Sequence, residues 1–325
     1  MTASERRIES SVLDRSIGAV LGGAVGDALG AGYEFVNAPE PDEVTMLSGT
    51  MTGEPAGHWT DDTAMAIAIL EVAAKEGSLV TERAVEEVSE RFLDWFRSRP
   101  LDVGAQIREV LSGARSGRDL AASAEVVQAK DPDRAGNGSL MRTSSVALAH
   151  LGDEAALVVA ARTMSALTHP NVYALDACIL WTMAIDDAIR TGKLVGPRVG
   201  LHLIDDSRRT RWERCIDDAE MLVPHTFKPN GFVVTALQAS WSAIHTTRHS
   251  KNHFVDGLRQ AIAIGDDTDT VAAISGSLLG ARYGAATIPM EWRKDLAGWP
   301  RQYGETNLVR LAIQAATWGI NGMQV

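Results

Sequence analysis

Glycine recurs at every fourth position of an apolar segment near the start of the chain, at Gly18, Gly22, Gly26 and Gly30. Apolar residues fill the intervening positions at three- and four-residue steps, a pattern that predicts a helix over residues 11–30. On such a helix the four glycines share one face, although each costs up to about 1 kcal/mol in a helix interior. The stripe therefore indicates that another element approaches this backbone closely.

A second stripe, formed by Gly276, Gly280 and Gly284, lies in or beside a predicted helix over residues 268–283. We predict that the two striped helices occupy the buried centre of the fold. Replacing a glycine of either stripe by leucine should then abolish folding, because the added side chain has no space.

Helical periodicity continues through most of the chain. The further predicted helices cover residues 62–75, 82–97, 102–111, 138–151, 154–167, 171–190, 205–221, 231–244, 254–264 and 305–318. Residues 113–134 are predicted to be irregular and 191–197 to form a loop, whereas Phe232–Val234 is the single strand candidate. We therefore predict an all-α fold, with one compact multi-helix domain over residues 11–325 after a flexible segment, residues 1–10.

Composition limits the possible partners and compartment. A net charge of −11 argues against a general nucleic-acid surface. Cys178 and Cys215 have neither metal-type spacing nor the number needed for a disulfide framework. The chain shows no signal-peptide core and no apolar run that could span a bilayer. We expect a cytoplasmic monomer that binds neither membranes nor nucleic acids in general.

An acidic segment directly precedes the second striped helix. Residues 265–270 read Gly-Asp-Asp-Thr-Asp-Thr, with three carboxylates in four positions. A helix start favours one or two acidic or threonine caps, but three carboxylates repel one another unless a counter-charge is present. The surplus of hard oxygen ligands suggests a divalent cation of the magnesium, manganese or calcium kind.

A similar acidic helix start occurs at residues 57–63, Gly-His-Trp-Thr-Asp-Asp-Thr. Either segment alone could be an ordinary helix cap. If the fold brings both together, their four central carboxylates roughly balance two divalent cations, and threonine hydroxyls add neutral ligands. Zinc is disfavoured because no His/Cys cluster accompanies them. The predicted metal ligands are Thr60, Asp61, Asp62, Asp267, Asp269 and Thr270.

Five motifs, in this order, carry a family resemblance: residues 22–30 (GGAVGDALG), 60–63 (TDDT), 136–142 (GNGSLMR), 168–170 (THP) and 267–270 (DTDT). The chain resembles the ADP-ribosylglycohydrolase family. The resemblance implies an all-α fold with two Mg²⁺ or Mn²⁺ ions in a cleft. It also implies hydrolysis of the glycosidic bond between ADP-ribose and an acceptor. A protein arginine is the first choice, and serine, another protein side chain or a small-molecule ADP-ribosyl substrate stay open.

The resemblance also implies roles for individual residues. Glu34, Asp61 and Asp102 match positions near the ribose and the metals, and we expect them to be catalytic. The expected substrate-binding residues are Gly136, Asn137, Gly138, Ser139 and His169. Asp266 stands where the family often has glycine, so its carboxylate is an extra.

Other interpretations stay open for several of these residues. Asp27 suits a buried carboxylate held by backbone bonds better than a catalytic group, and Glu34 could be an exposed loop acid. Arg142 could anchor its helix or touch phosphate, and His169 could pack in a loop. Trp59 and Trp241 could stack on adenine or belong to the core.

Two other functions also stay open. The chain could be a non-catalytic ADP-ribose-binding or crystallin-like member of the family. Alternatively, it could be a two-metal nucleotide phosphohydrolase, which an acidic cage suits equally.

Overall fold

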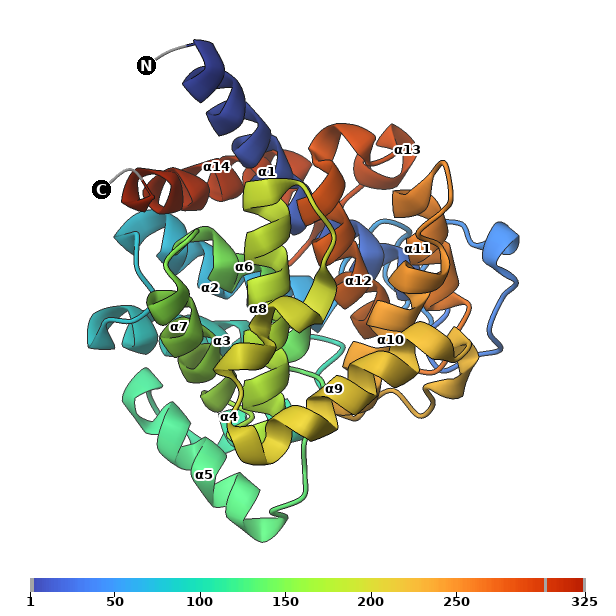
Figure 1. The fold of residues 1–325 in the computed structure, drawn as a ribbon. Helices are drawn as coiled ribbons and strands as arrows, with labels where there is room; N and C mark the ends of the chain where they lie inside the picture. The colour runs from blue at the N-terminus through green and yellow to red at the C-terminus, as the bar shows by residue number, and fades with distance from the viewer. Residues whose placement is uncertain (1–2, 301–302, 324–325) are drawn as a thin grey trace.

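The computed structural model describes residues 3–300 and 303–323, and the chain there is almost entirely helical (Figure 1). The first half forms α1 (Ala3–Gly30), α2 (Asp61–Glu76), α3 (Glu82–Arg97), α4 (Ala105–Gly113), α5 (Leu120–Lys130), α6 (Ser144–Leu148) and α7 (Glu154–Ala166). The second half forms α8 (Val172–Thr191), α9 (Asp206–Met221), α10 (Val233–Thr246), α11 (His253–Ile262), α12 (Thr268–Tyr283), α13 (Met290–Arg293) and α14 (Glu305–Gly322). Two short antiparallel strands, β1 (Ala297–Gly298) and β2 (Tyr303–Gly304), precede α14. The predicted all-α class is confirmed.

The two glycine-striped helices, α1 and α12, lie against each other through the middle of the molecule. A β-carbon on Gly22 would collide with the carbonyl oxygen of Gly276, and one on Gly280 would collide with that of Gly18. Further along, Gly26 approaches Ala272 in the same way. The contacts run in opposite chain directions, so the helices are antiparallel. The prediction that both helices are central and buried is confirmed.

This contact sets where the helix ends meet. Gly30, at the end of α1, lies against the backbone of Thr268 and Asp269 at the start of α12. The Thr268 hydroxyl donates to the Gly30 carbonyl at 2.8 Å. One turn earlier, the side chain of Asp27 reaches the start of α2. Both acidic helix starts are therefore held beside the C-terminal end of α1.

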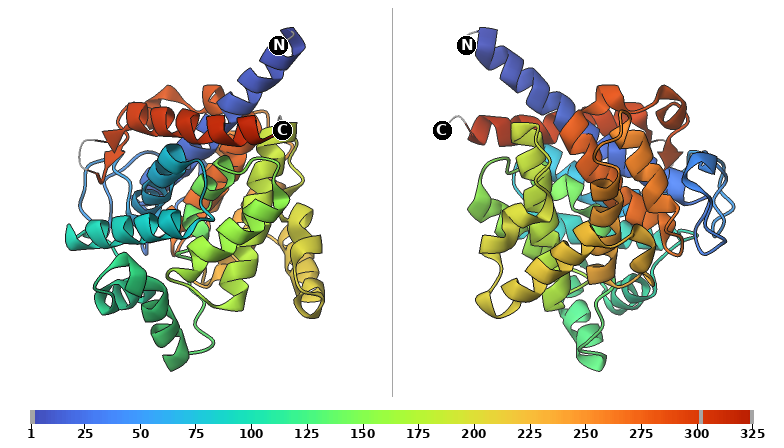
Figure 2. Two further views of the ribbon diagram at one scale, coloured as in Figure 1. Left: turned by 90° about the vertical axis from the view of Figure 1, so that its left-hand side faces the viewer. Right: turned by 45° about the vertical axis from the view of Figure 1, so that its right-hand side comes forward.

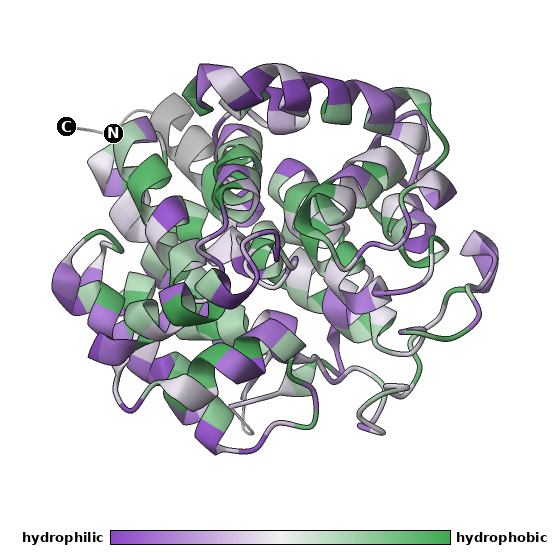
Figure 3. Cartoon of the chain, turned by 90° about the horizontal axis from the view of Figure 1, so that it is seen from below, coloured by the Kyte–Doolittle hydropathy of each residue, from purple (hydrophilic) through white to green (hydrophobic). Residues whose placement is uncertain are grey.

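The remaining helices surround this centre. α8, α10 and α11 contact α12, and α14 contacts α1 and α2 (Figures 1 and 2). Figure 3 shows hydrophobic residues concentrated on the inner helices and hydrophilic residues toward the outside. The first turns of α1 extend away from the body of the molecule (Figure 2). Among the described helices, none combines the length and apolar character that a bilayer crossing requires.

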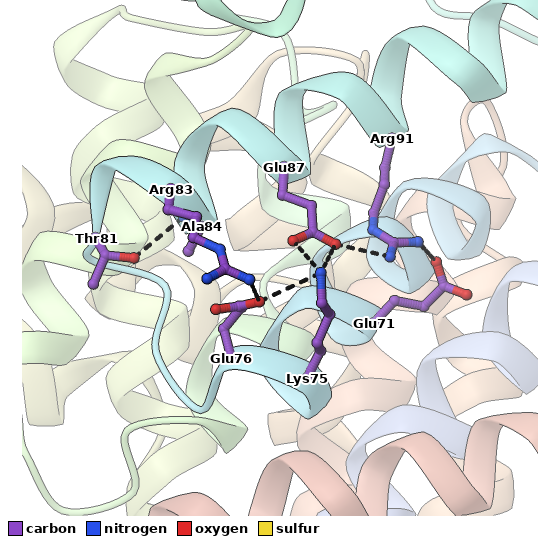
Figure 4. Close-up of polar contacts among 8 residues, drawn as sticks. All are labelled: Glu71, Lys75, Glu76, Thr81, Arg83, Ala84, Glu87 and Arg91. Carbon is purple, nitrogen blue, oxygen red and sulfur yellow. Dashed lines mark hydrogen bonds and ion pairs between the residues drawn. The ribbon is translucent and has the colours of Figure 1, made fainter.

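Polar contacts join the second half of α2 to α3 (Figure 4). Lys75 forms an ion pair with Glu87 at 2.8 Å, and Arg83 forms one with Glu76 at 2.9 Å. Arg91 pairs with Glu71 and also with Glu87. An exposed pair alone contributes little to stability, but this network restrains α2, whose first turn carries Asp61 and Asp62.

Several local predictions are wrong. The segment 113–134, predicted as irregular, contains α5, whose three buried residues (Leu120, Ala124 and Val127) give a weak periodic signal among alanines and serines. Phe232–Val234 is not a strand; Phe232 caps α10, because the alanine-rich continuation favours helix over the β-branched start. The predicted helix over 138–151 is broken into a 3₁₀ turn, η3 (Leu140–Arg142), and α6.

Helix limits also differ from prediction. Asp102–Gly104 form a loop before α4 rather than its first turn. α1 begins at Ala3 rather than residue 11. Residues 1–2 of the predicted flexible segment lie outside the described residues.

The backbone contact between α1 and α12 yields a test by single methyl groups. Gly22→Ala should lower the free energy of unfolding by about 3 kcal/mol or more, because the β-carbon meets a backbone carbonyl that cannot move aside. Gly22→Leu and Gly280→Leu should prevent folding. Thermal denaturation followed by circular dichroism measures the change.

Gly23→Ala is the matched control on the same helix. Its β-carbon would meet its nearest neighbour, the Ala273 carbonyl oxygen, at an ordinary 3.6 Å. We expect a neutral or slightly stabilising effect, since alanine is the better helix former. Equal melting temperatures for Gly22→Ala and the wild type would contradict the close contact.

Candidate active site

The start of α2 is capped by a side chain from another helix. Asp27 Oδ1 accepts hydrogen bonds from the backbone N–H and the hydroxyl of Thr60, both at 2.9 Å. Its Oδ2 accepts from the N–H of Thr63 at 2.9 Å. Burial raises the pKa of Asp27 to about 6, and these hydrogen bonds oppose the rise. The interpretation of Asp27 as a buried carboxylate held by backbone bonds is confirmed.

Carboxylate oxygens crowd around the Thr60 hydroxyl. Besides Asp27, Oδ2 of Asp62 lies 3.1 Å and Oδ2 of Asp269 3.3 Å from Thr60 Oγ1. The Thr270 hydroxyl lies 3.4 Å from the same Asp62 oxygen. One hydroxyl proton serves only one acceptor at a time, so the Thr60 hydroxyl can satisfy only one of these three carboxylates.

Asp62 shows the consequence most clearly. Its Oδ1 is buried and has no hydrogen-bond partner among the described residues. Burial, and then the neighbouring carboxylates, raise the pKa of Asp62 and of Asp269 well above the usual range. Ligand atoms of Asp27, Asp62 and Asp269 all lie within 4.8 Å of one another. Such a buried set of hard oxygens, with one Asp62 oxygen left without a hydrogen-bond partner among the described residues, fits a divalent cation.

A second acidic group adjoins the first and shares Asp269 with it. Glu34, Asp267 and Asp269 also bring ligand atoms within 4.8 Å of one another. Glu34 is only 6% exposed, so the exposed-loop interpretation is wrong. Burial, followed by repulsion from Asp102 and Asp267, raises the pKa of Glu34 to about 9. Two groups with one common carboxylate fit a pair of cations.

Two asparagines hold Asp267 in place. The side-chain amide of Asn137 donates to Asp267 Oδ2 at 2.8 Å and to the carbonyl of Asn230 at 3.1 Å. Asn230 Oδ1 accepts the N–H of Asp267 at 3.0 Å, and its amide donates to the Gly265 carbonyl. Asn230 is fully buried. Sequence reasoning missed it, although a Pro-Asn-Gly turn directly before an apolar helix is a visible signal.

Asp61 and Asp102 lie beside these groups rather than within them. Asp61 Oδ2 accepts the N–H of Gly104 at 3.4 Å, which joins α2 to the loop that carries Asp102. Burial, and then the charge of Asp102, raise the pKa of Asp61 well above its usual value. Burial and repulsion from Asp267 also raise the pKa of Asp102.

A cavity of about 430 Å³ opens over the acidic groups. Its wall includes the acids Glu34, Asp61, Asp102, Asp267 and Asp269, together with Gly136, Asn137, Gly138, Gln106, Arg134, His169 and Thr270. Ser139 does not line it, since its hydroxyl accepts from Ser165 at 2.9 Å in the interior. The structure thus brings all but one of the predicted catalytic and substrate-binding residues to a single cavity.

Arg142 supports this cavity from beneath. Its guanidinium is buried and donates to the carbonyl of Met164 at 2.7 Å and to the Thr168 hydroxyl at 2.8 Å. It also lies over the ring of Phe92. The anchoring interpretation is therefore confirmed. The Thr168 hydroxyl lies 2.7 Å from Nδ1 of His169, and burial with the charge of Arg142 lowers the pKa of that histidine well below its usual value.

The comparisons with known proteins agree with this arrangement. Residues 8–319 match the family model described as ADP-ribosylglycohydrolase. The chain belongs to the ADP-ribosylglycohydrolase family. It is 31% identical over 300 residues to an ADP-ribosyl-[dinitrogen reductase] glycohydrolase of Rhodospirillum rubrum, covering 88% of this chain and 91% of the relative.

Further relatives give the same picture. The chain is 29% identical to an ADP-ribosylarginine hydrolase, Tri1, of Pseudomonas putida (strain GB-1), covering 88% of this chain and 75% of the relative. A solved ADP-ribosylglycohydrolase-related protein complex superimposes with a TM-score of 0.72 at 27% identity, over 95% of this chain and 99% of that one. Membership in this glycohydrolase family makes the chain an enzyme acting on ADP-ribose linkages.

The remaining predicted residues lie outside the acidic groups. The Asp266 side chain is 37% exposed and lies 3.6 Å from Lys228 Nζ. Trp241 is 3% exposed in the core, where it contacts Gly196. Trp59 is 5% exposed and lines a second cavity beside Asp61.

The raised pKa values predict how the metal-free enzyme responds to pH. A carboxyl group whose pKa is higher in the folded state stabilises the fold below its unfolded pKa, and that stability is lost as the pH rises through the folded pKa. For Asp27 and Glu34 the folded pKa values are about 6 and about 9. In EDTA, the melting temperature should therefore fall between roughly pH 5 and pH 8.

Added Mg²⁺ or Mn²⁺ should raise the melting temperature more at about pH 8 than at about pH 5, because protons compete for the ligands at low pH. Asp62→Asn serves as the comparison, since it removes one buried charge and should flatten the pH dependence. A metal-free melting temperature that increases over this pH range would contradict the crowding of charged carboxylates.

Proposed function

We propose that this enzyme hydrolyses the bond between C1″ of ADP-ribose and a side chain of an ADP-ribosylated protein, with arginine as the acceptor. The observation that carries the proposal is a pair of acidic groups whose shared member, Asp269, lines a cavity together with the Gly136–Gly138 loop. We assign two divalent cations, Mg²⁺ or Mn²⁺, to this site. Their ligands would be Thr60, Asp61, Asp62, Asp267, Asp269 and Thr270, with Asp27 supporting the first group.

Charge orients the substrate in this cavity. Pyrophosphate is an anion, so positively charged side chains and N–H donors favour its binding. Arg134 is the one arginine or lysine that lines the cavity within the described part of the chain. The backbone N–H groups of the adjacent Gly136–Gly138 loop suit phosphate oxygens. We therefore assign the pyrophosphate to this loop and the distal ribose to the acidic end.

The glycines of this loop and His169 form one surface. A β-carbon on Gly138 would lie 3.0 Å from Cε1 of His169, and one on Gly136 would lie 3.3 Å from its Nε2. With a lowered pKa the imidazole is neutral. When the Thr168 hydroxyl donates to Nδ1, the ring proton is on Nε2, where it can donate to a substrate oxygen.

The chemistry of the bond determines what the carboxylates do. Cleavage develops positive charge at C1″, which the surrounding carboxylates stabilise. Asp61 or Asp102 accepts a proton from the attacking water, and Glu34 supplies a proton or a hydrogen bond to the departing group. When bound, the cation pair would add polarisation of water and of the ribose hydroxyls.

Arginine is the proposed acceptor because the name of one relative states that linkage. The name of a second relative states that its substrate is a modified protein. One is an ADP-ribosylarginine hydrolase and one an ADP-ribosyl-[dinitrogen reductase] glycohydrolase. We further propose that the enzyme acts as a monomer in the cytoplasm. Release of ADP-ribose from arginine-linked and serine-linked substrates, compared in parallel, tests the choice of acceptor.

Substitutions in the second acidic group, which contains Glu34, Asp267 and Asp269, test the site. Asp267→Asn and Asp269→Asn should each lower the rate of ADP-ribose release by more than about 100-fold, because a ligand loses its charge. Asp266→Asn is the matched control, since its side chain is 37% exposed and faces Lys228. Chromatography of the products, with circular dichroism to verify folding, measures the effect.

The products also separate the alternatives. Free ADP-ribose indicates glycosidic cleavage, whereas AMP with ribose phosphate would identify a nucleotide phosphohydrolase. Binding of ADP-ribose without turnover would indicate a non-catalytic module. Full activity in EDTA would refute the metal assignment.

A further inference from the structure

A second cavity, of about 350 Å³, borders the same two carboxylates as the first. Asp61 and Asp102 line both cavities. A substrate whose reacting bond lies at these carboxylates can therefore place its ADP-ribose in the first cavity and its acceptor in the second. We propose that the second cavity is the acceptor subsite and that it takes a planar cation, the guanidinium of an arginine side chain. This inference rests on the proposed glycohydrolase function.

The walls of this cavity are preformed by two segments distant in sequence. The Trp59 N–H donates to the Ala297 carbonyl at 3.0 Å, and the Ala297 N–H donates to the Gly57 carbonyl at 3.1 Å. Trp59 Nε1 donates to the Trp299 carbonyl at 3.1 Å. A β-carbon on Gly298 would collide with the Trp59 ring. A site that is already rigid loses less entropy on binding.

The lining favours a cation with flat, apolar faces. Trp59, Trp95 and Trp299 all line the cavity, and of these Trp299 is the most accessible, since the other two are buried. An aromatic ring attracts a guanidinium placed over its face. Trp299 is therefore the ring that we assign to the acceptor.

The charges point the same way. Glu54 lines the cavity with a side chain that is 43% exposed, and Asp61 and Asp102 close it on the side of the first cavity. Glu54 has His58 as a partner at 3.2 Å through one oxygen. Arg99, which also lines the cavity, is exposed to solvent. Carboxylates match the planar donors of a guanidinium, whereas they would repel a pyrophosphate.

Two substitutions test the assignment. Trp299→Ala removes the ring but keeps the carbonyl that receives the Trp59 hydrogen bond. Glu54→Gln removes one exposed charge. We expect each to raise the ratio of the KM for ADP-ribosyl-arginine to the Kd for free ADP-ribose by about tenfold, because only the arginine compound occupies the acceptor subsite.

Trp318→Ala is the matched control. Trp318 is 50% exposed on α14 and lines neither cavity. Its substitution should leave the ratio at the wild-type value. An unchanged ratio in both test variants, or an equal rise of KM and of the ADP-ribose Kd, would overturn the subsite.

Agmatine, a small guanidinium compound, separates this inference from the proposed function. Its binding to the Mg²⁺-loaded protein, measured by calorimetry, requires no turnover. We expect Glu54→Gln and Trp299→Ala to weaken it relative to the wild type and to Trp318→Ala. Equal agmatine affinity in all four proteins overturns the subsite, whereas absence of ADP-ribose release from the wild type overturns only the hydrolase proposal.

Discussion

The backbone contact between α1 and α12 is the interaction on which the rest of the structure depends. Glycine lets two helices approach until the backbone of one lies where a side chain of the other would be. Because the helices are antiparallel, this contact ends where Gly30 lies against Asp269. The same register carries Asp27 to the start of α2 and Glu34 to the start of α12. The position of the acidic site is thus a direct result of helix packing.

The fold accepts an electrostatic cost at that junction. Buried carboxylates that face one another destabilise a protein unless they are protonated or paired with cations. Two features lower the cost without removing it: Asp27 is satisfied by three donors, and Asp267 Oδ2 accepts a hydrogen bond from the Asn137 amide. Asp62 keeps one buried oxygen without a partner in the described part of the chain. The surrounding helices must supply the stability that this site subtracts.

Local patterns in the sequence were enough to predict the central helices and the acidic helix starts, because glycine spacing and acidic caps are properties of single segments. The family motifs then brought residues 60–63 and 267–270 together. The sequence did not reveal that Asp27 caps a helix belonging to another segment, or that Asn230 bridges Gly265 and Asp267. Such contacts join residues far apart in the chain and leave no periodic signal. The second cavity was missed for the same reason, since Trp59 and Trp299 lie 240 positions apart and Trp299 belongs to none of the family motifs.

Asp61 and Asp102 form an acidic wall between the first cavity and the second, so that the two ends of the cleft differ. Because both carboxylates border both cavities, any ligand that spans them must pass this wall. On the proposed assignment, an anionic pyrophosphate lies in the first cavity beside Arg134 and the Gly136–Gly138 loop. A cationic acceptor in the second cavity would be attracted by Glu54. The bond between ribose and acceptor then lies at Asp61 and Asp102, and a neutral acceptor would lose the contribution of Glu54 to that alignment.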